Sequence, residues 1–426
     1  MKKKASTSLG KRGWLIVFSS FLLFMLGTGL VTDFLNVSVA SIAERNGGWD
    51  TALMLTISSV AGWVTLAVAI VAGVIVQKKG ARKVMFISTL CFTIAVFFLG
   101  SVTQLWQYVI CIFVISIADA VQSGMAMQTV IAAWFPTKKG IAMGWATLGL
   151  NMSTIAFLPF FNWLNGSFGV AKAYYVIGVI CLAVCIFNYI NVRDFPEQAG
   201  QAPDNSDNFD REATAAEAKK IVEYTRSSPW TIGKLLRTKQ VWQVSLMLGC
   251  GMMVATGVLG QFVPRMASLG IDVHIAVSML SLCCIVGIFF SPTWGYLDNK
   301  FGAKKITSVM LILYLVALLL MIVAGSNVPV TCISLCIFFG SLGGINNMLT
   351  SYTTSVFGRY DFASANRVMY PIYNVVRCCA FGLVGISSKL ADGNYTVTYL
   401  LMAACLVAAI IASFFTKDTM IGRSAP

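Results

Sequence analysis

The chain has 426 residues, of which 57% are hydrophobic and only 11% are charged. Soluble globular domains carry about 25% charged residues, so this composition excludes an ordinary water-soluble protein. The formal net charge of +14 would by itself suggest a nucleic-acid partner. The basic residues lie in short polar segments between apolar stretches, however, so no nucleic-acid partner is expected.

The apolar stretches predict the fold class. About twelve of them are long enough to cross the hydrocarbon of a bilayer as a helix. Their centres lie near residues 27, 64, 92, 118, 152, 181, 250, 286, 315, 340, 378 and 405. The first follows the basic start MKKKASTSLGKRG and is longer than the apolar part of a signal peptide, so we expect it to be retained. The chain is therefore predicted to be an all-α membrane protein with twelve transmembrane helices.

A long polar segment divides the predicted helices into six and six. Residues 193–237 are mixed in charge, and a short amphipathic helix is expected near residues 213–225. We predict an N-terminal six-helix bundle at residues 1–192, a cytoplasmic linker at 193–237 and a C-terminal six-helix bundle at 238–426.

The distribution of charge predicts the orientation in the membrane. The chain has 31 lysines and arginines, and most of them fall on the same side as the N-terminus and the linker. Because loops rich in basic residues stay in the cytoplasm, we expect a multi-pass protein of the cell (inner or plasma) membrane with both termini cytoplasmic.

Two loops at equivalent places in the two halves share a pattern. Residues 73–83 read GVIVQKKGARK, and residues 295–305 read GYLDNKFGAKK. Both loops resemble the signature loop of the major facilitator superfamily, G-x-x-x-D-[RK]-x-G-[RK]-[RK]. Gln77 and Asn299 stand where the family has an acid, and Asp298 lies one place early. The resemblance implies two duplicated six-helix bundles that transport by alternating access.

A narrower resemblance involves residues 134–149, WFPTKKGIAMGWATLG. They are similar to the W-F-x-x-[KR]-[KR]-G-x-A-x-G block of the oxalate:formate antiporter and monocarboxylate transporter branch, which implies a carboxylate transporter and not an enzyme. In that branch a basic residue in the eleventh helix and an arginine in the eighth are associated with anion binding. Arg377 matches the first position, and Ser291 stands at the second.

The eleventh predicted helix carries a charge at mid-membrane depth. Tyr370, Tyr373, Asn374 and Arg377 lie at i, i+3, i+4 and i+7 and so share one face of the helix. Arg377 is too far from either end of the helix to reach the interface, and a charge at this depth needs a partner or a polar cavity. We interpret the stripe as a cavity wall that binds substrate.

Two aspartates lie inside predicted helices. Asp119 shares a face with Gln122, and Asp33 shares one with Asn36. Desolvation favours the neutral form of a buried carboxyl group, so each aspartate is a candidate for binding a coupling proton. The alternative is that either one forms a fixed ion pair with Arg377. Gln122 and Asn36 are candidate substrate-binding residues on these faces.

Other polar or small residues in the predicted helices have less specific interpretations. Arg265 follows Pro264 near the outer end of the seventh helix, and we expect it to contact lipid headgroups. Gly140 and Gly144 predict close helix packing. Some lone amides are either cavity residues or contacts between helices. They are Gln128, Gln261, Asn346 and Asn347.

No cofactor, metal or protein partner is predicted. The 12 cysteines fall within predicted helices and have neither the spacing of a disulfide framework nor that of a metal site. No G-x-x-x-x-G-K-[ST] loop occurs, so ATP hydrolysis is not expected.

These patterns favour a secondary transporter of a small organic monocarboxylate, coupled to protons or working by exchange. Arg377 would bind the carboxylate, Tyr370 and Tyr373 would pack against its body, and Asp33 or Asp119 would bind the coupling proton. Two alternatives stay open. One is a transporter of a cationic or zwitterionic compound, including efflux, whose aspartates bind the substrate. The other is a membrane sensor or scaffold that signals through the linker.

Overall fold

The computed structural model describes residues 9–206, 211–390, 395–417 and 419–423, and within these ranges it contains helices and no strand. The helices of the first half are α1 (Gly10–Thr28), α2 (Leu35–Arg45), α3 (Thr51–Lys79), α4 (Ala81–Gly100), α5 (Leu105–Asp119), α6 (Gln128–Trp134), α7 (Lys139–Ala146), α8 (Leu148–Met152), α9 (Leu158–Phe168) and α10 (Val170–Asn191). The π-helical segments η1 (Gly29–Asp33), η2 (Ala120–Met127) and η3 (Ser153–Phe157) join some of these helices into longer ones.

The linker is partly helical. It contains the 3-10 turns η4 (Pro196–Ala199) and η5 (Pro203–Asn205) and the helices α11 (Arg211–Arg226) and α12 (Ile232–Leu236), so the helix expected near residues 213–225 is confirmed. The second half consists of α13 (Lys239–Ser268), α14 (Val273–Phe301), α15 (Ala303–Ala324), α16 (Val328–Leu390) and α17 (Tyr395–Phe415).

The number of membrane crossings follows from the lengths of these helices. In the described part of the chain, 11 helices are long and apolar enough to cross a membrane, and one of them, Val328–Ala380, has 53 residues. One crossing needs about 20 residues, and α16 is interrupted at Gly358, whose φ of 68° and ψ of 179° are not helical. This helix therefore holds two crossings, which confirms the predicted all-α protein with twelve transmembrane helices.

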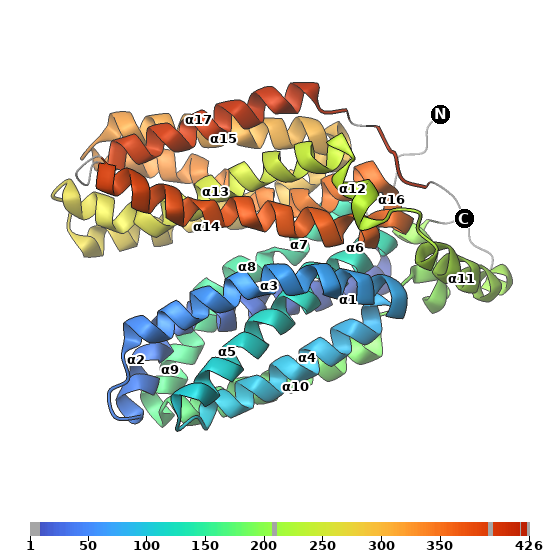
Figure 1. Cartoon of the computed structure of the whole chain (residues 1–426), viewed down its shortest axis with the longest axis horizontal. Helices are drawn as coiled ribbons and strands as arrows, with labels where there is room; N and C mark the ends of the chain where they lie inside the picture. The colour runs from blue at the N-terminus through green and yellow to red at the C-terminus, as the bar shows by residue number, and fades with distance from the viewer. Residues whose placement is uncertain (1–8, 207–210, 391–394, 418, 424–426) are drawn as a thin grey trace.

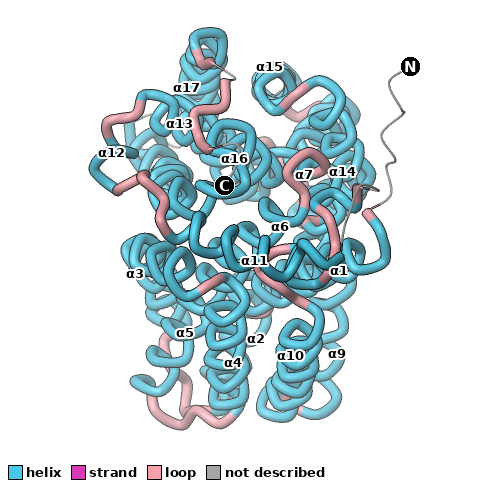
Figure 2. Tube along the Cα trace, turned by 90° about the vertical axis from the view of Figure 1, so that its right-hand side faces the viewer, coloured by secondary structure: helices cyan, strands magenta, loops and turns pink. Residues whose placement is uncertain are grey.

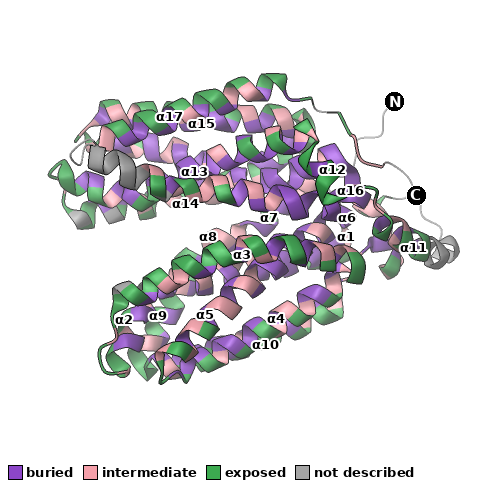
Figure 3. Cartoon of the chain, viewed as in Figure 1, coloured by how far each residue is buried: buried purple, intermediate pink, exposed green. Residues whose placement is uncertain are grey.

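The helices form two groups, each around its own hydrophobic core. Buried side chains between residues 9 and 192, joined by Ala363, form one core, and those between residues 230 and 409 form the other. In Figure 1 the two groups converge toward the end where α11, α12 and the C-terminal tail lie, which we call the linker end. Exposed residues cover much of the outer faces (Figure 3), and many of them are large and apolar, as a lipid environment requires. The domain boundaries stay a prediction.

The two groups touch at the linker end through glycines. A Cβ atom on Gly140 of α7 would lie 2.6 Å from the carbonyl oxygen of Gly295 in α14, and a Cβ atom on Gly73 of α3 would lie 2.2 Å from Cβ of Arg367 in α16. Only glycine permits such an approach, so the close packing predicted for Gly140 is confirmed. Figure 2 looks onto this end and shows α11 lying across the boundary between the groups.

The duplicated loops have matching backbones. Gly80 precedes α4 with φ 92° and ψ 147°, and Gly302 precedes α15 with φ 88° and ψ 150°. A positive φ in this region is accessible mainly to glycine, which explains why both loops keep a glycine at the place where one helix ends and the next begins.

Candidate functional site

A cavity of about 580 Å³ lies between the two groups of helices. Its walls come from α1, η1, α5, η2, α6, α8 and η3 of the first half and from α13, α14 and α16 of the second. Most of the predicted site residues line it. They are Asp119, Tyr370, Tyr373, Asn374 and Arg377.

The guanidinium of Arg377 meets this cavity without an acidic partner. The side chain is half-buried and lines the cavity. Among the residues that the structure describes, no carboxylate oxygen lies within 4.0 Å of its nitrogens, and no hydrogen bond to its side chain is found. The ion pair of Arg377 with Asp33 or Asp119 is therefore not formed in this conformation. An anion in the cavity would find the guanidinium open to it.

The neighbours of Arg377 on α16 form one wall of the cavity. Tyr373 is buried, and Asn374 Nδ2 donates a hydrogen bond of 2.9 Å to the carbonyl oxygen of Tyr370. The hydroxyl of Tyr370 reaches the opposite half, where a Cβ atom on Gly124 would lie 2.7 Å from it. The stripe read from the sequence thus faces the cavity as a unit.

Asp119 lines the cavity from the other half. Ser123 Oγ donates to Asp119 Oδ1 at 2.9 Å. Gly27 of α1 leaves room for this carboxylate, because a Cβ atom there would lie 2.0 Å from Asp119 Oδ1. Gln122, by contrast, is fully buried outside the lining of the cavity. Gln122 belongs to the π-helical segment η2, which follows Asp119 directly.

Asp33 lies beside the cavity and not in its wall. Its Oδ2 accepts hydrogen bonds from Ser153 Oγ at 2.7 Å and from Thr154 Oγ1 at 3.0 Å. Its neighbours Thr32 and Thr154 do line the cavity. The side chain of Asn36 lies outside the described residues.

Several cavity residues were missed by the sequence analysis. Thr147, Asn151 and Thr154 line the cavity from the fifth predicted helix. Their spacing of i, i+4 and i+7 is the signal that would have found them. Of the lone amides, Gln128 and Asn346 also line the cavity.

Hydrogen bonds between the halves lie next to the cavity. Thr147 Oγ1 donates to Asn347 Oδ1 at 2.5 Å, and Ser291 Oγ donates to the Gly144 carbonyl oxygen at 2.9 Å. A Cβ atom on Gly144 would lie 2.8 Å from the Ser291 carbonyl oxygen. Ser291 stands where the oxalate:formate and monocarboxylate branch has its second arginine. In this chain the residue is fully buried in the contact between the halves.

The expectation that Arg265 contacts lipid headgroups is wrong. The residue is 3% exposed, Nη2 donates to the Met321 carbonyl oxygen at 2.5 Å, and Cζ lies 4.7 Å from the centre of the Tyr399 ring. Because α13 continues through Pro264 to Ser268, Arg265 stays inside the bundle.

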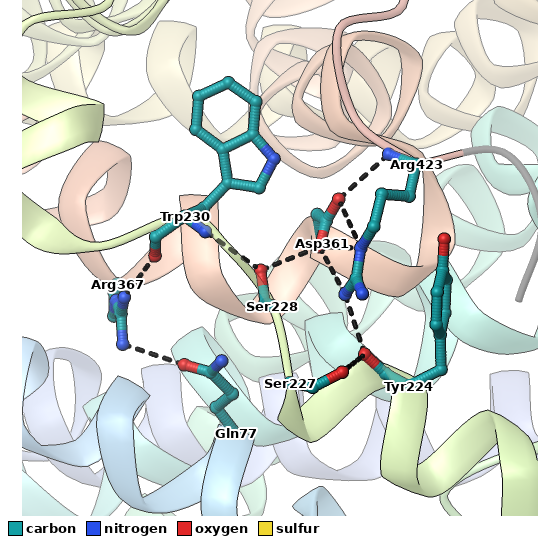
Figure 4. Close-up of polar contacts among 8 residues, drawn as sticks. All are labelled: Gln77, Tyr224, Ser227, Ser228, Trp230, Asp361, Arg367 and Arg423. Atoms are coloured by element: carbon teal, nitrogen blue, oxygen red, sulfur yellow. Dashed lines mark hydrogen bonds and ion pairs between the residues drawn. The ribbon is translucent and has the colours of Figure 1, made fainter.

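A polar cluster at the linker end connects the first duplicated loop, the linker and the C-terminal tail (Figure 4). Arg367 Nη1 donates to Gln77 Oε1 at 2.8 Å, and Arg367 Nη2 donates to the carbonyl oxygen of Trp230 at 2.5 Å. Gln77 stands where the signature pattern has an acid. Arg367 therefore forms a hydrogen bond with a neutral amide here and not an ion pair with a carboxylate.

The same cluster holds the tail. Arg423 donates to the carboxylate of Asp361 from its backbone N, Nε and Nη2 at 2.9, 3.0 and 2.8 Å. Arg423 Nη2 also donates to the Tyr224 carbonyl oxygen at 2.8 Å, and Ser228 Oγ donates to Asp361 Oδ1 at 2.7 Å. Arg359 forms a further ion pair, with Glu197 of the linker. The sequence analysis did not find these contacts because the partners are far apart in the chain.

Comparisons with known proteins agree with this architecture. A family model described as the Major Facilitator Superfamily matches residues 13–381. The oxalate:formate antiporter of Oxalobacter formigenes is 28% identical over 241 residues, which cover 55% of this chain and only 52% of the antiporter. Monocarboxylate transporter 2 of Rattus norvegicus is 23% identical over 430 residues, covering 93% of this chain and 81% of that protein.

A solved structure agrees in fold. The structure of the proton:xylose symporter XylE bound to 6-bromo-6-deoxy-D-glucose matches with a TM-score of 0.72 and 13% identity, over 96% of this chain and 97% of that chain. At this identity the likeness concerns the arrangement of helices alone.

Proposed function

Because this chain belongs to the Major Facilitator Superfamily, and is therefore a multi-pass membrane transporter and not an enzyme, we propose that it carries an organic monocarboxylate. The relatives named for oxalate and formate and for monocarboxylates support this substrate class. Family membership also speaks against the sensor alternative.

The observation that carries the proposal is the guanidinium of Arg377, which lines the central cavity and has no hydrogen-bond or ion-pair partner among the described residues. A guanidinium binds a carboxylate through two parallel hydrogen bonds, a geometry that lysine does not reproduce. Tyr370 and Tyr373 line the same wall and offer ring surface to an apolar substrate body. Ser291, at the position of the second arginine, is buried in the contact between the halves. Arg377 alone can bind one carboxylate group, which favours a monocarboxylate over a dicarboxylate.

Transport proceeds by alternating access, in which the two six-helix units proposed at residues 1–192 and 238–426 rock about the cavity. The described conformation is closed at the linker end by contacts such as Gly140 with Gly295. If the linker is cytoplasmic, as the basic loops favour, this conformation faces outward across the cell membrane.

Asp119 is the better placed of the two proposed proton carriers, because it lines the cavity and Asp33 does not. Protonation of Asp119 while substrate is bound would couple proton movement to uptake. Exchange of one carboxylate for another remains the competing mode, in which the charge of Asp119 stays constant.

Uptake of labelled monocarboxylates into proteoliposomes tests the proposal. Arg377→Ala is expected to abolish saturable uptake. Arg237→Ala, which removes an exposed arginine near α12, is the matched control and should transport normally. Undiminished uptake in Arg377→Ala would rule out the anion site.

A second candidate substrate class is a cationic or zwitterionic compound, because Asp119 offers a carboxylate in the same cavity. An amino acid or amine that competes with carboxylate uptake, and loses this effect in Asp119→Asn, would favour that class.

A further inference from the structure

A second cavity, of about 420 Å³, opens at the linker end and is separate from the central one. The first duplicated loop, the segment after α10 and the helix α11 enclose it. We call it the linker cleft. Its lining includes Gln77, the basic residues of the loop and of α11, and the hydroxyl-bearing Thr225.

The linker cleft is strongly basic. Its lining contains Lys79, Arg82, Lys83, Arg193 and Arg226, against the single acid Asp194. Burial and the nearby positive charges of Arg82 and Arg12 lower the pKa of Arg193. Such mutual repulsion indicates a positive potential that a bound anion would relieve.

Asp194, the one acid in the described lining of the cleft, already accepts a hydrogen bond from the protein backbone. Asp194 Oδ1 accepts a hydrogen bond of 2.6 Å from the backbone N of Arg82 at the start of α4. Burial also raises the pKa of Asp194, which disfavours its negative charge. Asp194 therefore holds the loop in place, and its single carboxylate stands against five basic residues of the described lining.

Polar groups without partners line the same space. Thr225 is 8% exposed, and its Oγ1 has no hydrogen-bond partner among the described residues. The buried Nε of Arg82 also lacks one, although Arg82 Nη2 is fixed on the Tyr189 carbonyl oxygen at 2.7 Å. A buried polar atom without a partner indicates a ligand or water at that place.

We propose that the linker cleft binds the phosphate group of an anion, either the headgroup of an anionic phospholipid or free inorganic phosphate. Lysine and arginine side chains approach the cleft from the loop, from the end of α10 and from α11, so that a phosphate would join the linker to the first half. Gln77 belongs both to the cleft and to the hydrogen bond with Arg367, so an anion here also stabilises the closed linker end.

The second half provides a matched control. Its duplicated loop carries Lys304 and Lys305 where the first carries Arg82 and Lys83, and no residue of that loop lines the linker cleft. Lys304 Nζ donates to the Phe414 carbonyl oxygen at 3.4 Å. On α11, Lys220 is exposed and lies outside the cleft. The pair Lys220 and Lys305 thus matches the pair Arg226 and Lys83 in charge and comes from α11 and from a duplicated loop, but lies outside the cleft.

Thermal unfolding of the purified full chain in detergent tests the site. Inorganic phosphate should raise the Tm more than sodium chloride at equal ionic strength. The double variant Lys83→Gln/Arg226→Gln should weaken the apparent affinity for phosphate about tenfold or more, while Lys305→Gln/Lys220→Gln should behave as the parent chain. A second arm compares nanodiscs of phosphatidylcholine with nanodiscs that also contain phosphatidylglycerol.

Each outcome decides. A phosphate effect that only the cleft variant loses supports a site for free phosphate. An effect of phosphatidylglycerol alone, again lost only in the cleft variant, supports a site for a lipid headgroup. Equal effects in both double variants, a chloride effect as large as that of phosphate, or no effect of either probe would overturn the proposal.

Discussion

Arg367 of α16 donates a hydrogen bond of 2.8 Å to Gln77 of α3, across the boundary between the two halves. The pair lies at the closed linker end, where Gly73 allows the stem of Arg367 to approach. Because the acceptor is a neutral amide and not a carboxylate, the contact is weaker than the ion pair that the signature pattern implies.

Gln77→Glu should strengthen this contact. The side chains have the same shape, and a hydrogen bond to a charged acceptor gains about 1 kcal/mol over a neutral one. We expect a higher Tm in detergent and slower substrate turnover in proteoliposomes, because the linker end has to open during transport. Gln201→Glu adds the same charge in the linker, away from Arg367, and serves as control. If both variants change the Tm equally, the hydrogen bond between residue 77 and Arg367 does not limit the opening of the linker end.

The tail contact predicts a second effect. Arg423→Ala would leave the buried carboxylate of Asp361 without its ionic partner, a loss of about 3 kcal/mol for a buried pair. The expected result is a lower Tm and faster cleavage of the linker by trypsin, since Tyr224 and Ser228 are tied to the same two residues. Lys417 is an exposed residue of the same tail. In the Lys417→Ala variant, trypsin should cleave the linker at the same rate as in the parent chain. Unchanged cleavage of Arg423→Ala would show that the tail does not hold the linker.

Gly27→Ala tests the placement of Asp119. A Cβ atom on Gly27 would lie 2.0 Å from Asp119 Oδ1, so the carboxylate has to move. We expect pH-driven uptake to fall about tenfold, with a loss of stability of about 1 kcal/mol because the side chain can rotate. Gly62→Ala is the matched control, since nothing lies within 4 Å of its added Cβ. Normal proton-driven uptake in Gly27→Ala would remove Asp119 from the coupling mechanism.

The parts of the fold that sequence predicted are those that a bilayer enforces. A membrane-spanning helix must form all its backbone hydrogen bonds internally and present apolar residues to lipid over about 20 positions. The crossings could therefore be counted from hydropathy. The four residues of the Arg377 face line one cavity, because α16 stays helical through Pro371 and a helix keeps i, i+3, i+4 and i+7 together.

The parts that sequence did not predict depend on irregular helices and on distant partners. Gln122 lies outside the cavity lining, in the π-helical segment η2, and no period of 3.6 residues anticipates such a segment. Arg265 was placed at the membrane surface because Pro264 resembles a helix end. Its burial depends on Met321 and Tyr399, which only the packed bundle brings near.

Ser291→Arg tests whether the second arginine of the branch would fit this chain. Ser291 is fully buried, and its carbonyl oxygen would lie 2.8 Å from a Cβ on Gly144. An arginine at this place would separate α7 from α14 and bury a charge without a partner. We expect a loss of stability of about 3 kcal/mol or more and no gain in dicarboxylate uptake. Ser291→Ala, which keeps the space, should lower the Tm only slightly. A stable Ser291→Arg variant that accepts dicarboxylates would place this residue in the cavity.

Arg377→Lys separates charge from geometry at the proposed anion site. Lysine keeps the positive charge but presents a point charge where arginine presents a planar fork. If the carboxylate is bound through two parallel hydrogen bonds, KM for the monocarboxylate should rise about tenfold, with a smaller change in the maximal rate, since one charged contact remains. Arg237→Lys, the exposed control, should leave KM unchanged. Initial rates of uptake over a range of substrate concentrations measure both quantities. A KM equal to that of the parent chain would mean that Arg377 acts only as a charge and that the two parallel hydrogen bonds do not contribute to binding.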